Sequence, residues 1–517
     1  MRRKSVASFV FCTLLVVLAG CRTAPVSYRH PPPSGIMTGG DTELGKRFIK
    51  PENVQTGNSG VYLISAPREA FQIRNALITH AEATIDLQYY LWKQDTTGRL
   101  ILQRILEAAD RGVRVRILLD DLPHVDRDAE HARIAAHPNI EFRLYNPINA
   151  RGVLRKPYFL LAGKRLNHRM HNKLIAVDGC TAILGGRNLG DDYFGVDPAL
   201  NFHDLDAFLT GPVTDEISSS FEQYWNASNA IPIEAMYHIR NKPAAHRRFR
   251  SRLEANLQHI LKNTPASLTP EYATTTQLLS DLANKLTWAP VEILTDPPNR
   301  YHETESSVIH KRLLALKEEA ESEILIHTPY LLPSDQTIRA FHTLTEQGVR
   351  VRIMTNSLMS NNHIAVHAHY KHERPRLLDA GVELYELKAK DELLDYYRKT
   401  NTQLADSNSG LHTKAYVIDG RTSVISSYNM DPRSRYWNTE TAVIIHGEAV
   451  GRQLQGTLET ALCPENAYRL ERTPKGRLYW VQDFEPQAET HAFEPDAPLI
   501  RRSLALVLAY LPVYNLL

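Results

Sequence analysis

The 517-residue sequence has few cysteines and almost no excess of either charge. Four cysteines do not make a disulfide framework. Lys and Arg number 60 against 58 Asp and Glu, so no broad basic field predicts nucleic acid as a partner. The apolar run at residues 6–18 is too short to span a bilayer comfortably. The whole sequence is 43% hydrophobic and 23% charged, which is typical of a globular protein. Its length is sufficient for two domains with separate cores.

The N-terminus carries the features of an export signal. Basic residues at 2–4 precede the apolar run, and small residues lead up to Cys21, which predicts a signal peptide over residues 1–20. The segment from Leu18 to Cys21 resembles a bacterial lipobox, which implies lipidation of Cys21; a plain signal peptide and an uncleaved anchor are the alternatives. The predicted location is the periplasmic side of a Gram-negative envelope. Arg22 beside the cysteine favours the inner leaflet of the outer membrane. Cys180 and Cys463 are then left either to pair or to stay unpaired and buried.

Two segments of the chain predict the same order of strand, helix and strand. Residues 83–92, 98–111 and 113–119 show it first, and residues 323–330, 337–347 and 349–354 repeat it. This order is typical of βαβ units. We therefore expect an α/β protein of two similar α/β/α sandwich domains, with mostly parallel mixed sheets, a pseudo-twofold relation and one shared active site.

Composition divides the chain further. A segment rich in Pro, Gly, Ser and Thr predicts a tether over residues 21–60. The two domains are expected at residues 61–232 and 287–475, with a polar, helix-friendly connector at 233–286 between them. Residues 476–517 are expected to form a C-terminal tail. Its last apolar stretch, from residue 499 on, predicts either a helix in a membrane interface with arginines among the headgroups or a helix docked on the protein core.

One short pattern occurs twice with a constant offset of 241 residues. The two sets of residues are His171, Lys173, Asp178, Gly179 and Asn188 in the first half, and His412, Lys414, Asp419, Gly420 and Asn429 in the second. Residues two apart on a strand point to the same side, so each His and Lys pair places an imidazole beside an ammonium where a phosphate could be held. Two such half-sites facing each other would supply one histidine to attack phosphorus and another to protonate the leaving oxygen.

The aspartate of each motif cannot orient its histidine. Asp178 is an odd number of residues from His171 and lies roughly 16 Å beyond Lys173 in an extended strand. We therefore expect Asp178, and Asp419 by the same argument, to hold the turn and its neighbours together.

The two motifs identify the chain as a member of the phospholipase D superfamily, which is recognised by paired HxKxxxxD motifs. The surroundings resemble bacterial cardiolipin synthases of the C type over roughly residues 65–475. The segments that carry this resemblance are Arg165-Leu166-Asn167, Arg169 to Lys173, Gly185 to Asn188, Tyr193-Phe194, Gln88-Tyr89-Tyr90, Trp92 and Gly98.

This resemblance implies a role for each motif residue. Orienting carboxylates are expected on later strands, where Asp204 and Glu440 match best and Asp206 competes in the first half. Lys173, Lys414, Asn188 and Asn429 would donate to the phosphate oxygens. His171 would be the nucleophile that forms a phosphohistidine and His412 the general acid and later base, although the sequence alone leaves these two roles exchangeable. No metal-ligand cluster is evident, and the resemblance implies no cofactor.

Several other residues have two interpretations. Tyr89, Tyr90 and Trp92 follow a predicted strand and could line a lipid entrance or pack in the core. Ser427, Arg433 and Ser434 could add hydrogen bonds near the second motif. Gly185 and Gly186 indicate close backbone approach. His369-Tyr370-Lys371 repeats the HxK spacing without the following strand, turn or Asn, and we expect it at the surface.

The function expected from these features is transfer of a phosphatidyl group through a covalent phosphohistidine to make cardiolipin. Substrates would be phosphatidylglycerol and, in addition, phosphatidylethanolamine, met at a membrane surface. A hydrolytic phospholipase D that releases phosphatidic acid is the first alternative. An envelope phosphodiesterase or nuclease is the second, against which the near-neutral charge and the predicted anchor argue. A lipid-binding protein with degenerate sites is disfavoured because every motif member is present in both halves. The oligomeric state is not predicted.

Overall fold

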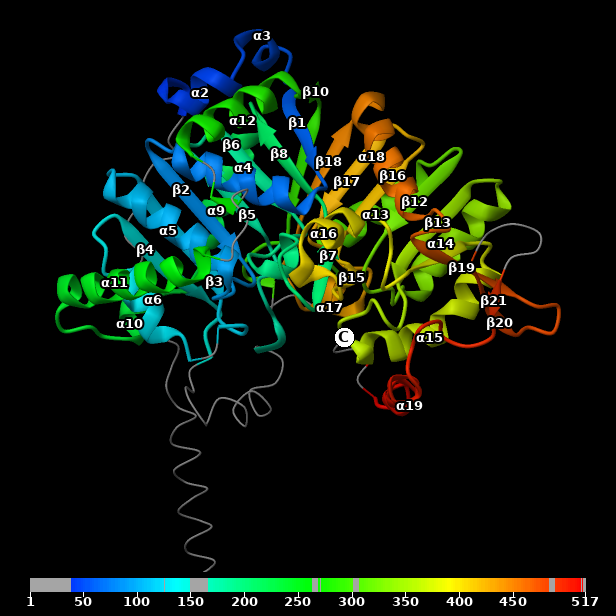
Figure 1. Ribbon diagram of the computed structural model, residues 1–517. Coiled ribbons are helices and arrows are strands. Elements are labelled where there is room, and N and C mark those ends of the chain that lie inside the picture. The colour runs from blue at the N-terminus through cyan, green and yellow to red at the C-terminus, as the bar shows by residue number, and fades with distance from the viewer. Residues whose placement is uncertain are drawn as a thin grey trace, which may run out of the picture.

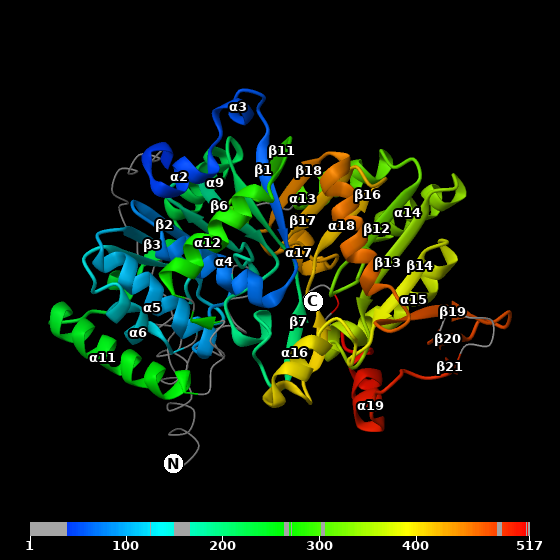
Figure 2. The same ribbon diagram turned by 45° about the horizontal axis from the view of Figure 1, so that its top comes forward.

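The computed structural model describes residues 39–124, 126–148, 166–262, 268–269, 271–300, 306–482, 489–512 and 514. The predicted signal peptide, Cys21 and Arg165 lie outside these residues. Two domains stand side by side, one formed by the first half of the chain and one by the second (Figures 1 and 2). No described helix combines the length and the apolarity needed to cross a membrane.

The described part of the first domain contains a nine-stranded sheet in the order β10-β1-β8-β6-β5-β2-β3-β4-β9. Its strands are β1 (Ser59–Ile64), β2 (Thr84–Tyr89), β3 (Arg114–Asp120), β4 (Ile140–Tyr145), β5 (Leu174–Val177), β6 (Thr181–Gly185), β8 (Asp206–Thr210), β9 (Ala230–Pro232) and β10 (Thr287–Ala289).

The second domain repeats this arrangement in a ten-stranded sheet with the order β11-β18-β17-β16-β12-β13-β14-β19-β20-β21. Its strands are β11 (Val291–Thr295), β12 (Glu323–His327), β13 (Arg350–Asn356), β14 (Glu383–Leu387), β16 (Ala415–Ile418), β17 (Thr422–Ser426), β18 (Thr441–His446), β19 (Ala467–Arg472), β20 (Leu478–Val481) and β21 (Thr490–His491). β10 and β11 are nearly continuous, so the chain passes from one sheet to the other at Pro290.

Both sheets are mixed, and the expectation that they are mostly parallel is wrong. Parallel pairing is confined to β2-β3-β4 in the first sheet and β12-β13-β14 in the second. The remaining pairs within the two sheets are antiparallel, and they include the hairpins formed by the motif strands, β5 with β6 and β16 with β17. Asp178 and Gly179 have φ values of 53° and 63°, and Asp419 and Gly420 have 52° and 62°. Two consecutive left-handed residues form a type I′ turn, which reverses the chain into β6 or β17.

Helices cover both sheets (Figure 1). Those before β11 are α2 (Glu43–Phe48), α3 (Pro51–Val54), α4 (Pro67–Thr79), α5 (Thr96–Asp110), α6 (Asp128–Ile134), α9 (Val213–Trp225), α10 (Ile233–Met236), α11 (Lys242–Leu261) and α12 (Tyr272–Asn284). Those after it are α13 (Val308–Glu318), α14 (Asp335–Glu346), α15 (Ile364–Asp379), α16 (Asp395–Thr400), α17 (Pro432–Tyr436), α18 (Glu448–Ala461) and α19 (Leu499–Leu508). Short 3-10 turns lie at Gly39–Asp41, Asp191–Tyr193 and Thr402–Leu404.

The helices of the two βαβ units, α5 and α14, both begin with a side-chain cap. Asp95 accepts a hydrogen bond from Gly98 N at the start of α5, and Ser334 accepts one from Thr337 N at the start of α14. Such side-chain acceptors satisfy free N–H groups of the first turn. Each helix then buries one apolar face and returns the chain to a parallel strand.

Two predicted boundaries need correction. The tether does not extend to residue 60, because Thr42 caps α2 and its residues Leu44 and Phe48 are fully buried in the first core. Two apolar residues four apart are enough to anchor this otherwise polar stretch. At the other end, β20 and β21 fall inside the predicted tail but extend the second sheet.

The two domains are joined through backbone as well as side chains. β7 (Leu200–His203) and β15 (Asn408–Leu411) form a parallel pair across the boundary. Met170 forms an isolated bridge with Thr439. One hydrophobic cluster also contains residues of both sheets, including Leu184 of β6 and Ile425 of β17. Both contacts between backbones lie next to a histidine motif.

Candidate active site

The two histidine motifs converge on one cavity between the domains. His171 and Lys173 come just before β5, and His412 and Lys414 come just before β16. The cavity has a volume of about 410 Å³ and both histidines line it. Its other lining residues include Tyr90, Asn188, Tyr193, Phe202, Tyr330, His363, Asn429 and Arg433.

Each imidazole is paired with a carboxylate of the opposite domain. His171 Nδ1 lies 2.9 Å from Glu440 Oε2. His412 Nδ1 lies 2.6 Å from Asp204 Oδ2. With Nδ1 held by a carboxylate, Nε2 is the nitrogen left for substrate on each ring. The sequence indicated these two carboxylates but not that they are exchanged between the domains.

Backbone pairing across the boundary produces this exchange. His171 N donates to Thr439 O at 2.9 Å, which places the next residue, Glu440, beside the imidazole. His412 N donates to His203 O at 2.8 Å, which places Asp204 in the same way. Asn172 adds hydrogen bonds to Thr439 and Thr441 across the first of these contacts.

The carboxylates differ in their other partners. Glu440 also accepts from the hydroxyl groups of Ser427 at 2.6 Å and Ser434 at 2.7 Å. Asp204 accepts from Leu205 N, and it lies against Gly186, where an added Cβ would come within 2.1 Å of Asp204 Oδ1. The close approach expected at Gly186 is therefore to a carboxylate.

Asp206, the competing candidate, contacts no imidazole in the described structure. Its Oδ2 accepts from Arg74 at 2.8 Å and from Arg187 at 3.1 Å, and all three side chains are buried. Asp206 begins β8, so its side chain points to the sheet face opposite to that of Leu205. Its ion pairs with Arg74 and Arg187 therefore stabilise the interior of the first domain.

Burial and the two ammonium groups favour the uncharged form of both histidines. Burial lowers the pKa of His171 to about 4, with Glu440 opposing this shift and Lys173 adding to it. Burial, Lys414 and Lys173 together lower the pKa of His412 well below its usual value. Burial raises the pKa of Asp204, whereas His171 and Lys173 overcome the burial of Glu440 and lower its pKa.

The lysines are held in equivalent positions. Lys173 Nζ donates to His171 O at 2.5 Å, and Lys414 Nζ donates to His412 O at 2.6 Å. Burial lowers the pKa of Lys173 to about 7 and that of Lys414 to about 8. Two buried ammonium groups beside one cavity favour an anionic ligand.

The two motif asparagines line the cavity and differ in their hydrogen bonds. Asn188 accepts from Leu91 N at 3.3 Å and donates to Tyr193 OH at 2.8 Å. The Oδ1 atom of Asn429 is buried without a hydrogen-bond partner. An amide oxygen only accepts, so it is the Nδ2 group of Asn429 that could donate to an anionic ligand.

Asp178 and Asp419 accept hydrogen bonds from backbone N–H groups at the start of a neighbouring strand, not from any imidazole in the described part of the chain. Asp178 accepts from the backbone N–H groups of Glu82, Ala83 and Thr84, at the start of β2. Asp419 accepts from residues 321–323 at the start of β12. Each carboxylate thus ties its motif hairpin to the neighbouring central strand.

The aromatic cluster after β2 is divided between the core and the site. Tyr90 lines the cavity, with its ring 5.1 Å from that of His171 and 5.7 Å from Lys173 Nζ. Tyr89 and Trp92 are buried in the first hydrophobic core. The site also contains Tyr330 and His363, which no sequence motif marked. They follow β12 and β13 at the carboxyl end, where α/β sheets place ligands, and that position was the available signal.

The expectation for the third HxK segment is wrong. His369 and Tyr370 are buried within α15, and only Lys371 is partly exposed. On a helix, residues two apart do not share a face, so the histidine and lysine cannot form a half-site. The two described cysteines are free thiols: Cys180 is buried and Cys463 is exposed.

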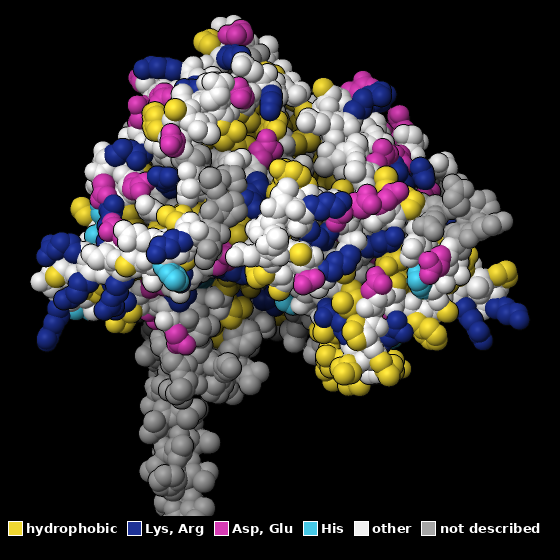
Figure 3. All heavy atoms as spheres, viewed as in Figure 1, with side chains coloured by type: hydrophobic (Ala, Val, Ile, Leu, Met, Phe, Trp, Pro, Cys, Tyr) yellow, Lys and Arg dark blue, Asp and Glu magenta, His cyan; other side chains and the backbone are white. Residues whose placement is uncertain are grey.

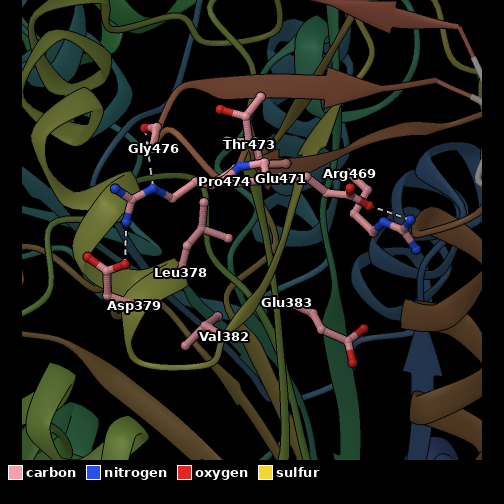
Figure 4. Close-up of a pocket in the computed structure, with 11 residues that line it drawn as sticks. Leu378, Asp379, Val382, Glu383, Arg469, Glu471, Thr473, Pro474 and Gly476 are labelled. Atoms are coloured by element: carbon pink, nitrogen blue, oxygen red, sulfur yellow. Dashed lines mark hydrogen bonds and ion pairs between the residues drawn. The ribbon is translucent and has the colours of Figure 1, made fainter.

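A wider hollow, of about 720 Å³, lies away from the histidines between α15, β14 and the β19–β20 hairpin (Figure 4). Its charged side chains are already paired: Arg472 with Asp379 and Arg469 with Glu471. Among the described residues, no three His, Cys, Asp or Glu side chains lie together as a metal site.

Two similar α/β domains, each with a mixed sheet and a His and Lys motif, and one shared cavity define a duplicated phospholipase D-like fold. The family model described as "Cardiolipin synthase, PLD-like domain" matches residues 75–225 and again 313–462. The chain belongs to this family of the phospholipase D superfamily, and it is a cardiolipin synthase-like enzyme of the phospholipase D type.

Known proteins match this chain over most of its length. It is 33% identical to cardiolipin synthase C of Escherichia coli over 463 residues, which is 89% of this chain and 97% of that protein. It is 24% identical to the major cardiolipin synthase of Bacillus subtilis over 430 residues, covering 83% and 74% of the two chains. The crystal structure of phosphatidylserine synthase from Haemophilus influenzae has the same fold, with a TM-score of 0.58, 14% identity and coverage of 91% and 96%.

Proposed function

We propose that the protein makes cardiolipin by transphosphatidylation through a covalent phosphohistidine. The observation that carries this proposal is the pair of imidazoles on one cavity, each with a carboxylate of the other domain on its Nδ1. Similarity to cardiolipin synthase C over 97% of that protein supports the choice of substrate class.

The reaction has two displacements at one phosphorus atom. In the first, His171 Nε2 attacks the phosphodiester, a P–N bond forms, the P–O bond to the donor headgroup breaks, and the leaving oxygen takes a proton from His412. In the second, the headgroup hydroxyl of phosphatidylglycerol gives its proton to His412 and attacks phosphorus. The P–N bond then breaks and His171 is regenerated.

The carboxylates support different roles for the two rings. Glu440, which accepts from two hydroxyl groups, stays ionised and holds the proton on His171 Nδ1, so that Nε2 carries the lone pair. Asp204, at 2.6 Å, stabilises a charged His412 once an anionic phosphate enters the cavity. The phosphodiester charge opposes the two lysines, which lower the pKa of His412.

The phosphate oxygens would be held by Lys173, Lys414, Asn188 and Asn429. Fixed donors of this kind stabilise the charge of a five-coordinate transition state by about 3 kcal/mol each. Each lysine already donates to the carbonyl oxygen of its histidine, and its Nζ has further N–H groups that can donate to a phosphate oxygen.

Seclusion of the site favours an alcohol over water as acceptor. His171 is 9% exposed and His412 is 5% exposed. A site that excludes bulk water protects a reactive intermediate from hydrolysis. The alternative is a phospholipase D that releases phosphatidic acid.

The purified full-length chain should be incubated with phosphatidylglycerol vesicles, with and without phosphatidylethanolamine, and the lipids resolved by mass spectrometry. Cardiolipin is expected, and phosphatidic acid as the sole product would replace transfer by hydrolysis. His171→Ala should abolish turnover and the trapped phosphohistidine. Lys173→Ala should lose most activity, whereas Lys371→Ala, the lysine of the third HxK segment, should retain it. Plasmid DNA should stay intact without metal, which separates this activity from a nuclease.

We further propose that Cys21 is lipidated and that the enzyme works on the periplasmic side of the envelope, at the outer membrane. The lipobox-like segment supports this proposal. Metabolic labelling with a fatty acid should mark the protein, and Cys21→Ser should lose the label. Retention of the label in that variant would reject the proposed anchor.

A further inference from the structure

The C-terminal helix α19 is attached to the domain by a narrow stripe. Ala505 is fully buried and packs with Leu358 and Ala368. Arg501, one turn earlier, donates to Leu358 O at 2.9 Å and to Asn361 O at 2.6 Å. This spacing of four residues places both anchors on one helix face, against α15 and the loop before it.

The rest of α19 presents large apolar side chains to the outside. The exposed set consists of Leu499, Ile500, Leu504, Leu506 and Val507 in the helix, with Tyr510 and Leu511 just after its end. Ile500 is 83% exposed and Tyr510 78%. In the space-filling view, hydrophobic side chains gather over α19 at the lower edge of the molecule (Figure 3). Apolar patches of this kind mark interaction sites, because isolated exposed residues are common but grouped ones are not.

The same attachment connects α19 to the active site. The loop that accepts the hydrogen bonds of Arg501 continues into Asn362 and His363, which line the cavity with Val366 of α15. Tyr330 of the cavity also donates to Asn362 Oδ1 at 2.9 Å. The apolar helix and one wall of the active site are therefore built on the same short segment.

We propose that α19 is a membrane-docking helix that seats this wall of the active site on a phospholipid surface. The choice of lipid rests on the proposed function, whereas the docking itself does not. A ten-residue helix with an apolar outer surface and arginines on its attached side can lie in a bilayer interface, with its side chains among the acyl chains.

A second copy of the chain fits this surface less well. The helix is only about 15 Å long. Each partner in a stable complex buries roughly 800 Å², so a dimer through one short helix would also need matching protein surface around it. A bilayer needs no matching protein surface, and exposed aromatic residues such as Tyr510 suit its headgroup region.

Vesicle binding of the full-length chain tests this proposal. Hydrogen exchange in residues 499–511 should slow when phosphatidylglycerol vesicles are added, which reports on α19 independently of any N-terminal anchor. Ile500→Ser with Val507→Ser should remove this protection and, in the unlipidated Cys21→Ser chain, weaken vesicle partitioning by about tenfold or more, from the apolar area lost. The matched control is Tyr272→Ser, an exposed residue of α12 at the other end of the molecule, and it should bind as wild type.

Activity separates docking from chemistry. On vesicles, the α19 variant should lose about tenfold in rate, and on a monomeric short-chain phosphodiester it should match wild type. Unchanged exchange in α19 on vesicles would overturn the proposal even if cardiolipin is made. Protection of α19 without any phospholipid turnover would keep the proposal and reject the proposed function. A concentration-dependent dimer that the variant abolishes would assign the surface to a second copy instead.

Discussion

His412 and Asp204 belong to different domains, yet His412 Nδ1 lies 2.6 Å from Asp204 Oδ2. The reverse pair, His171 and Glu440, completes the exchange. Neither domain therefore contains a whole catalytic pair, and the geometry of each imidazole depends on how the domains are docked. The β7–β15 pair and the Met170–Thr439 bridge fix that docking at the backbone, next to each histidine.

We expect Asp204→Asn to lower kcat by about 10³- to 10⁴-fold, on the scale seen when the carboxylate of a catalytic triad is replaced by an amide. The amide is similar in shape but does not stabilise a charged His412. Glu440→Gln should act similarly through His171 and should also reduce the trapped phosphohistidine. Steady-state kinetics, with melting temperatures to show that both variants are folded, would measure these losses. A variant with wild-type kcat would remove its carboxylate from the mechanism.

Gly186 offers a way to move Asp204 without changing it. A Cβ at this position would lie 2.1 Å from Asp204 Oδ1, so the carboxylate must move from its present place beside His412. We expect Gly186→Ala to lower kcat at least tenfold, because a catalytic hydrogen bond is sensitive to displacements of about 1 Å.

The matched control for this substitution is Gly456→Ala in α18, where an added Cβ has no neighbour within 4 Å. It should keep wild-type kinetics and raise stability by about 0.5–1 kcal/mol through helix propensity. Equal kinetics of the two alanine variants would show that the position of Asp204 does not limit the reaction.

The sequence predicted the duplication because the motif members keep a constant offset, and it predicted the α5 and α14 units from their apolar period. It did not predict which carboxylate faces which histidine. Asp204 follows His171 by 33 residues and Glu440 follows His412 by 28 residues, and neither spacing says whether a carboxylate faces the histidine of its own domain or that of the other domain. Only the docking of the domains distinguishes these two arrangements.

Other differences arise where a local sequence signal overrides the overall composition or spacing. The Asp178-Gly179 turn encodes an antiparallel hairpin of β5 and β6 in a sheet that was expected to be mostly parallel. Two apolar residues of α2 anchor a stretch whose overall composition suggested a tether. His369 has the spacing of the motif, but its segment forms a helix, which destroys the shared face that the motif requires.

Asp178→Asn should mainly reduce stability. Its carboxylate accepts three backbone N–H groups at the start of β2, and hydrogen bonds to a charged acceptor contribute about 1.5–3 kcal/mol each. The amide retains one acceptor oxygen, so we expect a loss of about 2–4 kcal/mol in the free energy of unfolding by urea. The kcat of the folded fraction should change little, and a specific loss of kcat at full stability would contradict a structural role.

The equivalent change, Asp419→Asn, provides an internal comparison. Two of its backbone bonds, to Glu321 and Ser322, are exposed, whereas the bond from Thr84 to Asp178 is buried. Exposed partners can be replaced by water, so Asp419→Asn should destabilise the protein less than Asp178→Asn.

The rate should depend on pH through the two lysines and His171. Burial lowers the pKa of Lys173 to about 7 and of Lys414 to about 8, so both are charged at lower pH and lose the charge as pH rises through these values. Because the charged form binds phosphate, kcat/KM should fall above about pH 7, roughly tenfold for each lysine lost per pH unit. On the acid side, His171 with a pKa of about 4 should stay nucleophilic down to that pH.

The profile of kcat, which reports on the bound complex, should have its alkaline limb at higher pH, because the anionic substrate raises the pKa of both lysines. Lys173→Arg keeps the charge at all these pH values and should remove the limb near pH 7 at the cost of a lower plateau. Lys371→Arg should leave the profile unchanged, and an alkaline limb that persists in Lys173→Arg would assign it to a different group.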